Sequence, residues 1–252
     1  MIKEIAIVSL LFTSVAFSQD RGSKPGSIAD TRAPAPETIS GTNSEGFDDI
    51  TNLPAGWVLE NRSNPIGTTD AWFQGNDVVF AAQAGAPTAY AAANFNATAG
   101  SDICTWMIMP DLGFLDTVSF WTRTATGSTF PDRMFVMHSP TGGTNTGDCF
   151  TDFGDFTNSL VEINPTLAQG GYPEDWTQFT ANVGGEGRVA FVYYVADGGP
   201  AGNNSNFIGV DSVEWVAGAP PAPAVPVPSL QWYALVALML VLLTLGYRKV
   251  KS

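Results

Sequence analysis

Short runs between residues 45 and 216 alternate apolar and polar side chains, and Gly- and Asp-rich turns separate these runs. Val118 and Phe120, for example, share one face of such a run, whereas Ser119 and Arg123 share the other. A period of two residues belongs to a strand, and no stretch of this region shows the 3.6-residue period of an amphipathic helix. The pattern therefore predicts an all-β domain.

Further segments fit the same interpretation. Residues 133–138 and 176–181 alternate in the strand manner, whereas 188–195 is apolar on both faces. A strand that is apolar on both faces is expected at the centre of a sheet. Short strands and tight turns over about 170 residues predict a two-sheet sandwich of the jelly-roll type, similar in architecture to a carbohydrate-binding module.

The charge balance excludes two classes of ligand. The chain has 24 Asp and Glu against 11 Lys and Arg, a net charge of −13. Only four of these acids, Glu4, Asp20, Asp30 and Glu37, lie before residue 45, which leaves 20 acids against four Arg in the domain, a charge of −16. Nucleic-acid binding requires a basic surface, and nucleotide binding has no glycine-rich phosphate loop here. We therefore expect neither ligand.

The N-terminus has the parts of a secretory signal peptide. A short charged start precedes an apolar run over 5–17, and small residues stand at Ala16 and Ser18. We expect a signal peptide at 1–18 with cleavage after Ser18. The alternative, a buried N-terminal strand or helix, has little to pack against, because 19–44 is a polar, Pro-containing spacer.

The C-terminus indicates a membrane anchor. A Pro-rich linker at 217–228 precedes a terminal segment at 229–252, in which 230–247 carries no charge. These 18 apolar residues are long enough to cross a bilayer core of about 30 Å, although a buried core helix is the alternative. The positive-inside rule places the domain outside and leaves in the cytoplasm the basic residues Arg248, Lys249 and Lys251.

The start of this tail resembles a known sorting signal. The run Val227-Pro228-Ser229-Leu230, followed by two aromatics, an apolar helix and a basic end, is similar to the IPTL-CTERM and PEP-CTERM class of bacterial sorting tails. The resemblance implies recognition and removal by a dedicated membrane protease. A permanent single-pass anchor is the simpler physical interpretation.

The two cysteines predict one disulfide. Cys104 and Cys149 would close a loop of about 46 residues, which stabilises a fold by at most about 4 kcal/mol in the chain-entropy description. A catalytic thiol is the alternative, and it would have to use the single histidine, His138, as its base. We expect His138 at the surface, at the point where a strand enters a turn.

Enzymatic chemistry has few candidates. A zinc site built on several histidines is excluded, and no Gly-x-Ser-x-Gly elbow accompanies His138. A glycoside hydrolase needs only two carboxylates about 5–10 Å apart. The acids available for such a pair include Asp48, Asp49, Asp77, Asp132, Asp211 and Glu214.

Asp211 is the acid with the most informative position. Strand parity groups it with Phe207, Val213 and Trp215, a face that we interpret as inward. A buried carboxylate requires a partner, and carboxylates with backbone carbonyls suit calcium. The alternative parity turns Asp211 outward. A second acidic run at 148–155 could also ligate calcium, although a solvated loop beside the disulfide fits its spacing better.

Aromatic residues offer a surface for stacking sugars. Trp57 and Trp72 are the candidates for ligand stacking, together with Phe73 and Trp106. The alternative is that these residues belong to the core, as aromatics in sandwiches usually do.

An ordered set of short motifs resembles the cleaved-adhesin family, also called the choice-of-anchor J domain. It begins with 46–57, which reads Gly-Phe-Asp-Asp and then Leu-Pro-Ala-Gly-Trp, and continues through 70–72, 106–110, 118–121, 135–139, Trp176 and 208–213. The resemblance implies a jelly-roll domain outside the cell, in which Asp48 and Asp211 hold a structural calcium ion. Ser212 and Met109 depart from the usual family residues at their positions.

These observations favour an exported, surface-displayed, non-enzymatic module that binds carbohydrate or a surface protein and is stabilised by calcium. A carbohydrate-active hydrolase with paired carboxylates is one alternative. A passive structural protein of the cell envelope is the other.

Overall fold

A computed structural model describes residues 43–220, 236–237, 239–240 and 242 of the chain. Its elements in chain order are β1 (Asn43–Glu45), η1 (Ile50–Asn52), β2 (Val58–Asn61), β3 (Phe73–Gln74), β4 (Ala91–Asn94), η2 (Phe95–Ala97), β5 (Ile103–Ile108), β6 (Leu115–Thr124), β7 (Met134–Ser139), β8 (Asn158–Ile163), β9 (Thr177–Gly185), β10 (Arg188–Val195) and β11 (Phe207–Ala217).

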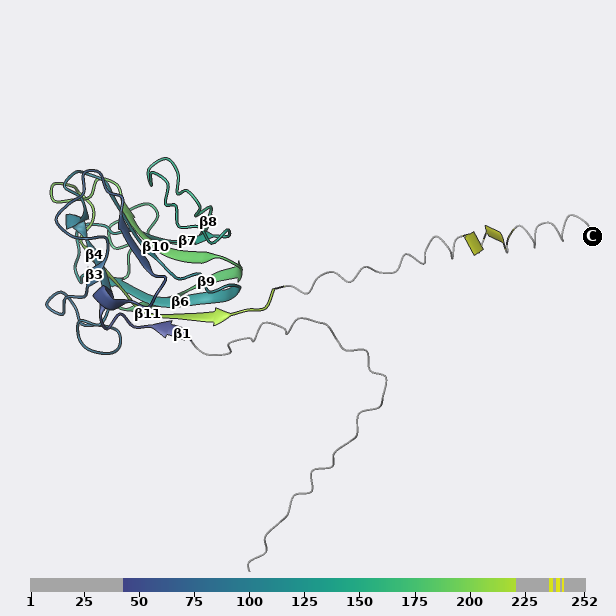
Figure 1. The fold of residues 1–252 in the computed structure, drawn as a ribbon. Helices are drawn as coiled ribbons and strands as arrows, with labels where there is room; N and C mark the ends of the chain where they lie inside the picture. The colour runs from purple at the N-terminus through teal and green to yellow at the C-terminus, as the bar shows by residue number, and fades with distance from the viewer. Residues whose placement is uncertain (1–42, 221–235, 238, 241, 243–252) are drawn as a thin grey trace, which may run out of the picture. The chain divides into compact units, whose positions relative to one another are not determined.

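The strands form two antiparallel sheets that face each other (Figure 1). One sheet has the order β3-β4-β11-β6-β9, with β1 paired to β11, and the other has the order β2-β5-β10-β7-β8. Strand β10 lies at the centre of its sheet, as its apolar sequence predicts. The prediction of an all-β, two-sheet sandwich is confirmed.

The main core lies between the sheets. Phe120 of β6 packs edge-on against Phe191 of β10 at a ring-centroid distance of 5.0 Å, which joins the two layers. The alternation in β6 is as expected, because Val118 and Phe120 are fully buried while Ser119 and Arg123 are partly exposed.

A smaller apolar cluster covers the outer side of each sheet. On one sheet, the 75–90 loop packs Phe80 and Tyr90 against Phe207 of β11. On the other, residues 140–157, which we call the strap, place Phe156 against Trp106 of β5. Strands β10 and β11 therefore bury side chains on both faces, because loops as well as the opposite sheet cover them.

The predicted terminal segments fall mostly outside the described residues. The signal peptide at 1–18 and the sorting motif at 227–230 lie there entirely, and β1 begins at the end of the predicted spacer. Residues 236–237, 239–240 and 242 are helical. Within the described part of the chain, no helix is both long and apolar enough to span a bilayer.

Candidate functional site

A junction of two acidic segments forms where β11 changes partners on one of its edges. Residues 207–210 pair with β4, and residues 213–215 pair with β1, so Asp211 and Ser212 lie in the gap between these partners. The pairing with β6 on the opposite edge shifts register at the same place, and Ser212 has a φ of 48°. This bulge reverses the alternation of β11.

The bulge explains the burial of Asp211, which is fully inaccessible. Sequence parity predicts an inward carboxylate, but Ile208 and Val210 occupy the main core instead, and Asp211 is buried beneath the 75–90 loop. After the bulge, Val213 returns to the core. The predicted burial is confirmed, whereas the predicted direction is wrong because a single bulge changes which residues share a face.

Backbone amides satisfy the carboxylate of Asp211. Its Oδ2 accepts N–H bonds from Gln83 at 2.7 Å and Ala84 at 3.1 Å, and its Oδ1 accepts one from Ser212 at 2.5 Å. Burial raises the pKa of Asp211, and these amide donors oppose that rise. The Ser212 hydroxyl donates to Gln83 Oε1 at 2.8 Å.

Asp48 approaches the same loop from the end of β1. A Cβ placed on Gly85 would lie 3.4 Å from Asp48 Oδ1, one residue beyond the amide that binds Asp211. Asp48 itself is exposed. The structure thus brings Asp48 and Asp211 to neighbouring positions of one loop.

Gln74 fixes the turn that carries Asp48. Its amide donates to the carbonyls of Phe47 at 2.9 Å and Thr88 at 2.6 Å, and its Oε1 accepts the N–H of Ile50 at 2.9 Å. No sequence motif marks Gln74, because its role depends on three segments that meet only in the fold. It is the main residue of this junction that sequence reasoning misses.

The oxygen atoms at this junction are of the chemical type that a hard cation such as calcium prefers. Calcium takes six to eight oxygen ligands, and the junction offers the two carboxylates of Asp48 and Asp211, the side-chain oxygen of Gln83 and neighbouring carbonyls. Within the described residues, no three His, Cys, Asp or Glu side chains gather closely enough to hold a metal. Backbone and amide oxygens would therefore supply most of the ligands.

Asp132, another acid considered for catalysis, is a structural link. It is 1% exposed, and its Oδ1 accepts the Tyr193 hydroxyl at 2.6 Å and the Asn206 N–H at 2.7 Å, while Oδ2 accepts the Thr124 hydroxyl at 2.5 Å. Burial raises the pKa of Asp132. The adjoining cavity of about 10 Å³ holds no more than one water molecule, so a substrate has no access from that side.

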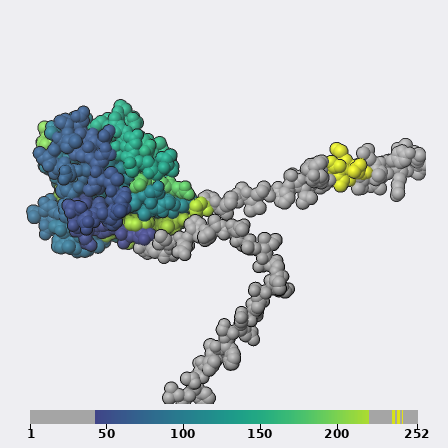
Figure 2. Space-filling model, in the orientation of Figure 1, coloured from purple at the N-terminus to yellow at the C-terminus, as the bar shows by residue number. Residues whose placement is uncertain are grey.

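A much larger groove opens beside the acidic junction. It has a volume of about 620 Å³ and is lined by η1, by Leu59 and Asn61 of β2, and by all residues of 66–74. These residues belong to the purple and blue part of the chain, which forms much of the face seen in Figure 2. Gln74 contributes to both the groove and the junction, so the two features share a wall.

The predicted stacking tryptophans differ in their environments. Trp72 is 2% exposed and packs in the main core, so its ring faces are not available for stacking. Trp57 is half-buried and packs edge-on against Phe47 at 5.6 Å. Trp106 is fully buried beneath the strap. Trp72 therefore does not offer a stacking surface, and the alternative of a core position holds for it.

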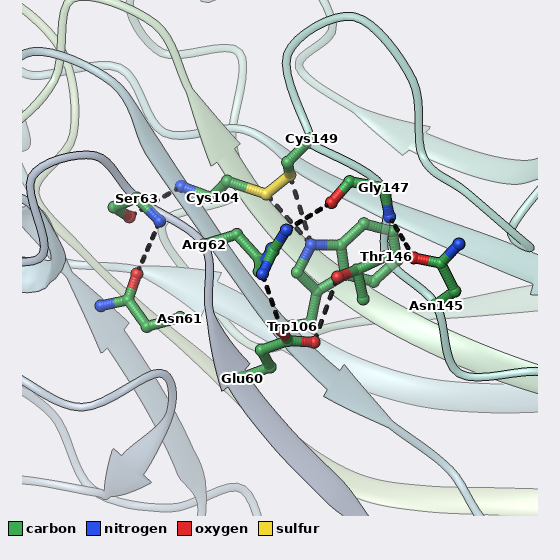
Figure 3. A network of polar contacts seen from close by, with 10 residues as sticks. All are labelled: Glu60, Asn61, Arg62, Ser63, Cys104, Trp106, Asn145, Thr146, Gly147 and Cys149. Atoms are coloured by element: carbon green, nitrogen blue, oxygen red, sulfur yellow. Dashed lines mark hydrogen bonds and ion pairs between the residues drawn. A yellow bond between two sulfur atoms is a disulfide. The ribbon is translucent and has the colours of Figure 1, made fainter.

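The predicted Cys104–Cys149 disulfide is present and joins the strap to β5 (Figure 3). The Trp106 indole N–H points at both sulfur atoms, at 3.1 and 3.2 Å. Polar contacts reinforce the attachment, because Arg62 donates to the Gly147 carbonyl at 2.7 Å and Thr146 donates to Glu60 at 3.1 Å. The strap is thus fixed to two strands of the sheet.

The acids of the strap stabilise its turns. Asp148 accepts hydrogen bonds from the Thr151 hydroxyl and from three backbone N–H groups. These bonds lower the pKa of Asp148, and the bond from the Thr151 hydroxyl has the largest effect. Asp152 accepts the Gly154 N–H, and Asp155 accepts the Asn145 N–H. Residues 148 and 150–152 are exposed beside the buried Cys149, as expected for a solvated loop next to the disulfide.

His138 is buried, contrary to the prediction of a surface position. It is 4% exposed in β7, its Nε2 lies 2.8 Å from the Glu186 carbonyl, and its Nδ1 lies 3.3 Å from Asn158 Nδ2. Strand β7 continues through Ser139 between β8 and β10, so the turn begins later than the sequence indicates. The sulfur atoms that His138 would have to activate are joined to each other.

Comparisons with known proteins identify the fold. No protein-family model and no curated protein matches the chain. The K1 cleaved adhesin domain of Lys-gingipain from Porphyromonas gingivalis is 22% identical with a TM-score of 0.50, over 71% of this chain and 99% of that one. The K2 cleaved adhesin domain of Lys-gingipain is 20% identical with a TM-score of 0.49, over 71% and 99%. TmCBM61, solved with β-1,4-galactotriose, is 15% identical with a TM-score of 0.40, over 69% and 94%. The chain therefore has the β-sandwich fold of the K1 cleaved adhesin domain.

Proposed function

We propose that this protein is an exported, surface-displayed, non-enzymatic binding module related to the cleaved adhesins, with a carbohydrate or a surface protein as its ligand. One observation carries the proposal: the two buried acids are already occupied by hydrogen-bond donors. Asp132 accepts three bonds and Asp211 accepts three backbone N–H bonds. An acid/base pair for hydrolysis needs carboxylates that face a substrate.

The test separates binding from turnover. We expect the full chain to bind members of a polysaccharide and glycan panel without releasing reducing sugar over hours of incubation. Release of reducing sugar that disappears in Asp48→Asn, with the fold unchanged by circular dichroism, would support the hydrolase instead. Absence of binding, together with normal adhesion of cells that lack the protein, would indicate a passive envelope component.

The terminal segments support display at the surface. We propose that the signal peptide is cleaved after Ser18 and that 230–247 anchors the protein in the membrane. A more specific hypothesis is that a sorting protease then removes the C-terminal tail. Mass spectrometry of the mature protein should find Gln19 at its N-terminus, and protease added to intact cells should digest the domain. A mature chain that still begins at Met1 would contradict the export hypothesis.

We also propose that calcium binds at the junction and has a structural role. The hypothesis is supported by two carboxylates that approach one loop, Asp48 from the turn after β1 and Asp211 from β11. An ion there would connect β1, β11 and the 75–90 loop. It would also offset the free-energy cost of an ionised Asp211, because burial raises the pKa of this carboxyl group.

Chelation should therefore lower the melting temperature. With calcium at about 100 times its Kd, the stabilisation is about 2.7 kcal/mol, which corresponds to roughly 5–10 °C for a domain of this size. Asp48→Asn tests the proposed ligand directly, because Asp48 is exposed and makes no hydrogen bond within the described residues, so its loss should not otherwise change stability. The variant should melt like the chelated protein and should not respond to EDTA. Identical melting of the wild type in calcium and in EDTA would refute the proposal.

A further inference from the structure

Hydrogen bonds attach both walls of the groove beside the acidic junction to the sandwich. Backbone N–H groups of Gly67 and Thr68 bind the carbonyls of Ala97 and Asn96 at 3.0 and 2.9 Å, which attaches one wall to η2. A Cβ on Gly67 would overlap the Asn96 carbonyl oxygen, so only glycine permits this approach. Gln74 holds the opposite wall through the N–H of Ile50. Binding sites for small ligands are typically preformed clefts of this size.

An unpartnered donor lies in the lining of this groove. Trp72 lines it and is 2% exposed, and its indole Nε1 is buried without a hydrogen-bond partner among the described residues. A buried N–H without an acceptor costs free energy, so such a group is usually satisfied by a water or a ligand. The Trp106 indole has the disulfide sulfurs as acceptors, whereas the Trp215 indole N–H, outside the groove, is also buried without a partner among the described residues.

The remaining free polar groups define what the groove accepts. Asp70 is exposed on the rim and its carboxylate makes no hydrogen bond within the described residues, whereas Asn61, Thr69 and Gln74 are engaged with protein atoms. Within the described residues, the free side-chain groups are therefore the Asp70 carboxylate, the Thr68 hydroxyl and the Trp72 indole N–H, beside apolar side chains such as Ile66.

Charge excludes acidic ligands from the groove. None of the four arginines of the described domain lines it, because they bind carbonyls or aromatic rings elsewhere; they are Arg62, Arg123, Arg133 and Arg188. Asp70 supplies the only charge of the lining. The lining therefore suits a ligand with hydroxyl groups that both donate and accept, an apolar face and no negative charge.

We infer that this groove is the ligand site of the proposed binding module and that it takes a neutral saccharide unit of a surface glycan. One sugar oxygen accepts from Trp72 Nε1 when the rim adjusts around the ligand, a sugar hydroxyl donates to Asp70, and the C–H face lies against Ile66. The inference rests on the proposed binding function and assigns its place and its ligand class. Stacking on exposed tryptophans is not required.

The indole resonances of the full chain provide a direct test. The chain has 7 Trp, and the Trp72→Phe variant assigns the Trp72 indole signal in a ¹H–¹⁵N spectrum. Neutral tri- and tetrasaccharides of glucose, galactose, mannose and N-acetylglucosamine are the probes, and oligogalacturonates of equal length are the acidic counterparts. We expect at least one neutral probe to shift the Trp72 indole signal more than any other indole signal. The acidic probes should leave the Trp72 signal unchanged.

Two variants measure the contributions of the groove by titration calorimetry. Trp72→Phe keeps an aromatic side chain but removes the indole N–H together with part of the ring volume, and it should weaken binding about three- to tenfold. Asp70→Asn retains the shape, changes no contact of the fold, and should weaken binding about tenfold while relaxing the exclusion of acidic probes. Trp57→Phe, outside the groove, is the matched control and should bind as the wild type does.

The outcomes distinguish this inference from the function on which it rests. If a neutral saccharide binds with an unmoved Trp72 signal and with equal affinity for Asp70→Asn, the groove is not the site and the binding function stands. Binding of only the acidic probes would overturn the proposed ligand class. If neither probe set binds, the inference fails, and adhesion of intact cells then decides separately whether the binding function survives.

Discussion

Replacing Asp132 with alanine should destabilise the domain by about 3–5 kcal/mol, which lowers the melting temperature by roughly 6–20 °C. The reason is that the carboxylate connects both sheets. Tyr193 lies on β10 and Thr124 lies on β6, and the substitution leaves the donors of both residues and the Asn206 N–H without their acceptor. Differential scanning calorimetry of the wild type and the variant measures the effect.

Asp116→Ala provides the matched control. Asp116 is an exposed acid on β6 and makes no hydrogen bond within the described residues, so its loss should change the melting temperature by no more than about 2 °C. Equal melting temperatures of Asp132→Ala and Asp116→Ala would show that the hydrogen bonds accepted by Asp132 do not stabilise the domain.

The pH dependence of Asp132→Asn tests the same site. Burial raises the folded-state pKa of Asp132 above its unfolded value, so the folded state binds more protons between these two values. The wild type therefore gains stability from this group as the pH falls toward about 4, and it loses that gain as the pH rises through the folded-state pKa. The asparagine variant lacks this dependence. The stability difference between wild type and variant should consequently increase from pH 7 to pH 4, and a constant difference would contradict the raised pKa.

Removal of the disulfide should have the second large effect. Cys104→Ala combined with Cys149→Ala releases a constraint across 45 residues, worth about 4 kcal/mol in the chain-entropy description. The strap should open before the sandwich unfolds, because it contains no strand and, apart from the disulfide, its polar attachments to the sheets come mainly from single side chains such as Arg62, Thr146 and Arg188. Limited proteolysis should then cut within 140–157, whereas the oxidised wild type resists cleavage there.

A reductant provides the matched control for this prediction. Treatment of the wild type with a dithiol should lower its melting temperature toward that of the double variant, which itself should not respond. The fluorescence of Trp106 should also change, because its indole lies against the two sulfurs. An unaltered melting temperature and proteolytic pattern in the double variant would show that the apolar contacts of Phe156 alone retain the strap.

Local pattern was sufficient for the fold class and for several elements. Alternation predicts β6 and β7 closely, and the two-sided apolar run correctly predicts the central position of β10. The same reasoning failed at Asp211, because a bulge at Ser212 changes the alternation within one strand. It also failed at His138, where pairing with two neighbours extends the strand beyond the polar residues that normally end one.

The sequence by itself determined the all-β class, the acidic and lysine-free composition of the 45–216 region, and the pairing of its two cysteines, because these depend on residue type and short-range periodicity. Only the tertiary structure decided that Asp132 bridges the sheets, that Gln74 joins the junction to the groove, and that Trp72 lies buried with an unused N–H. The reason is physical: each of these roles needs partners that are distant in the chain, and long-range contacts leave no periodic trace in the residues that make them.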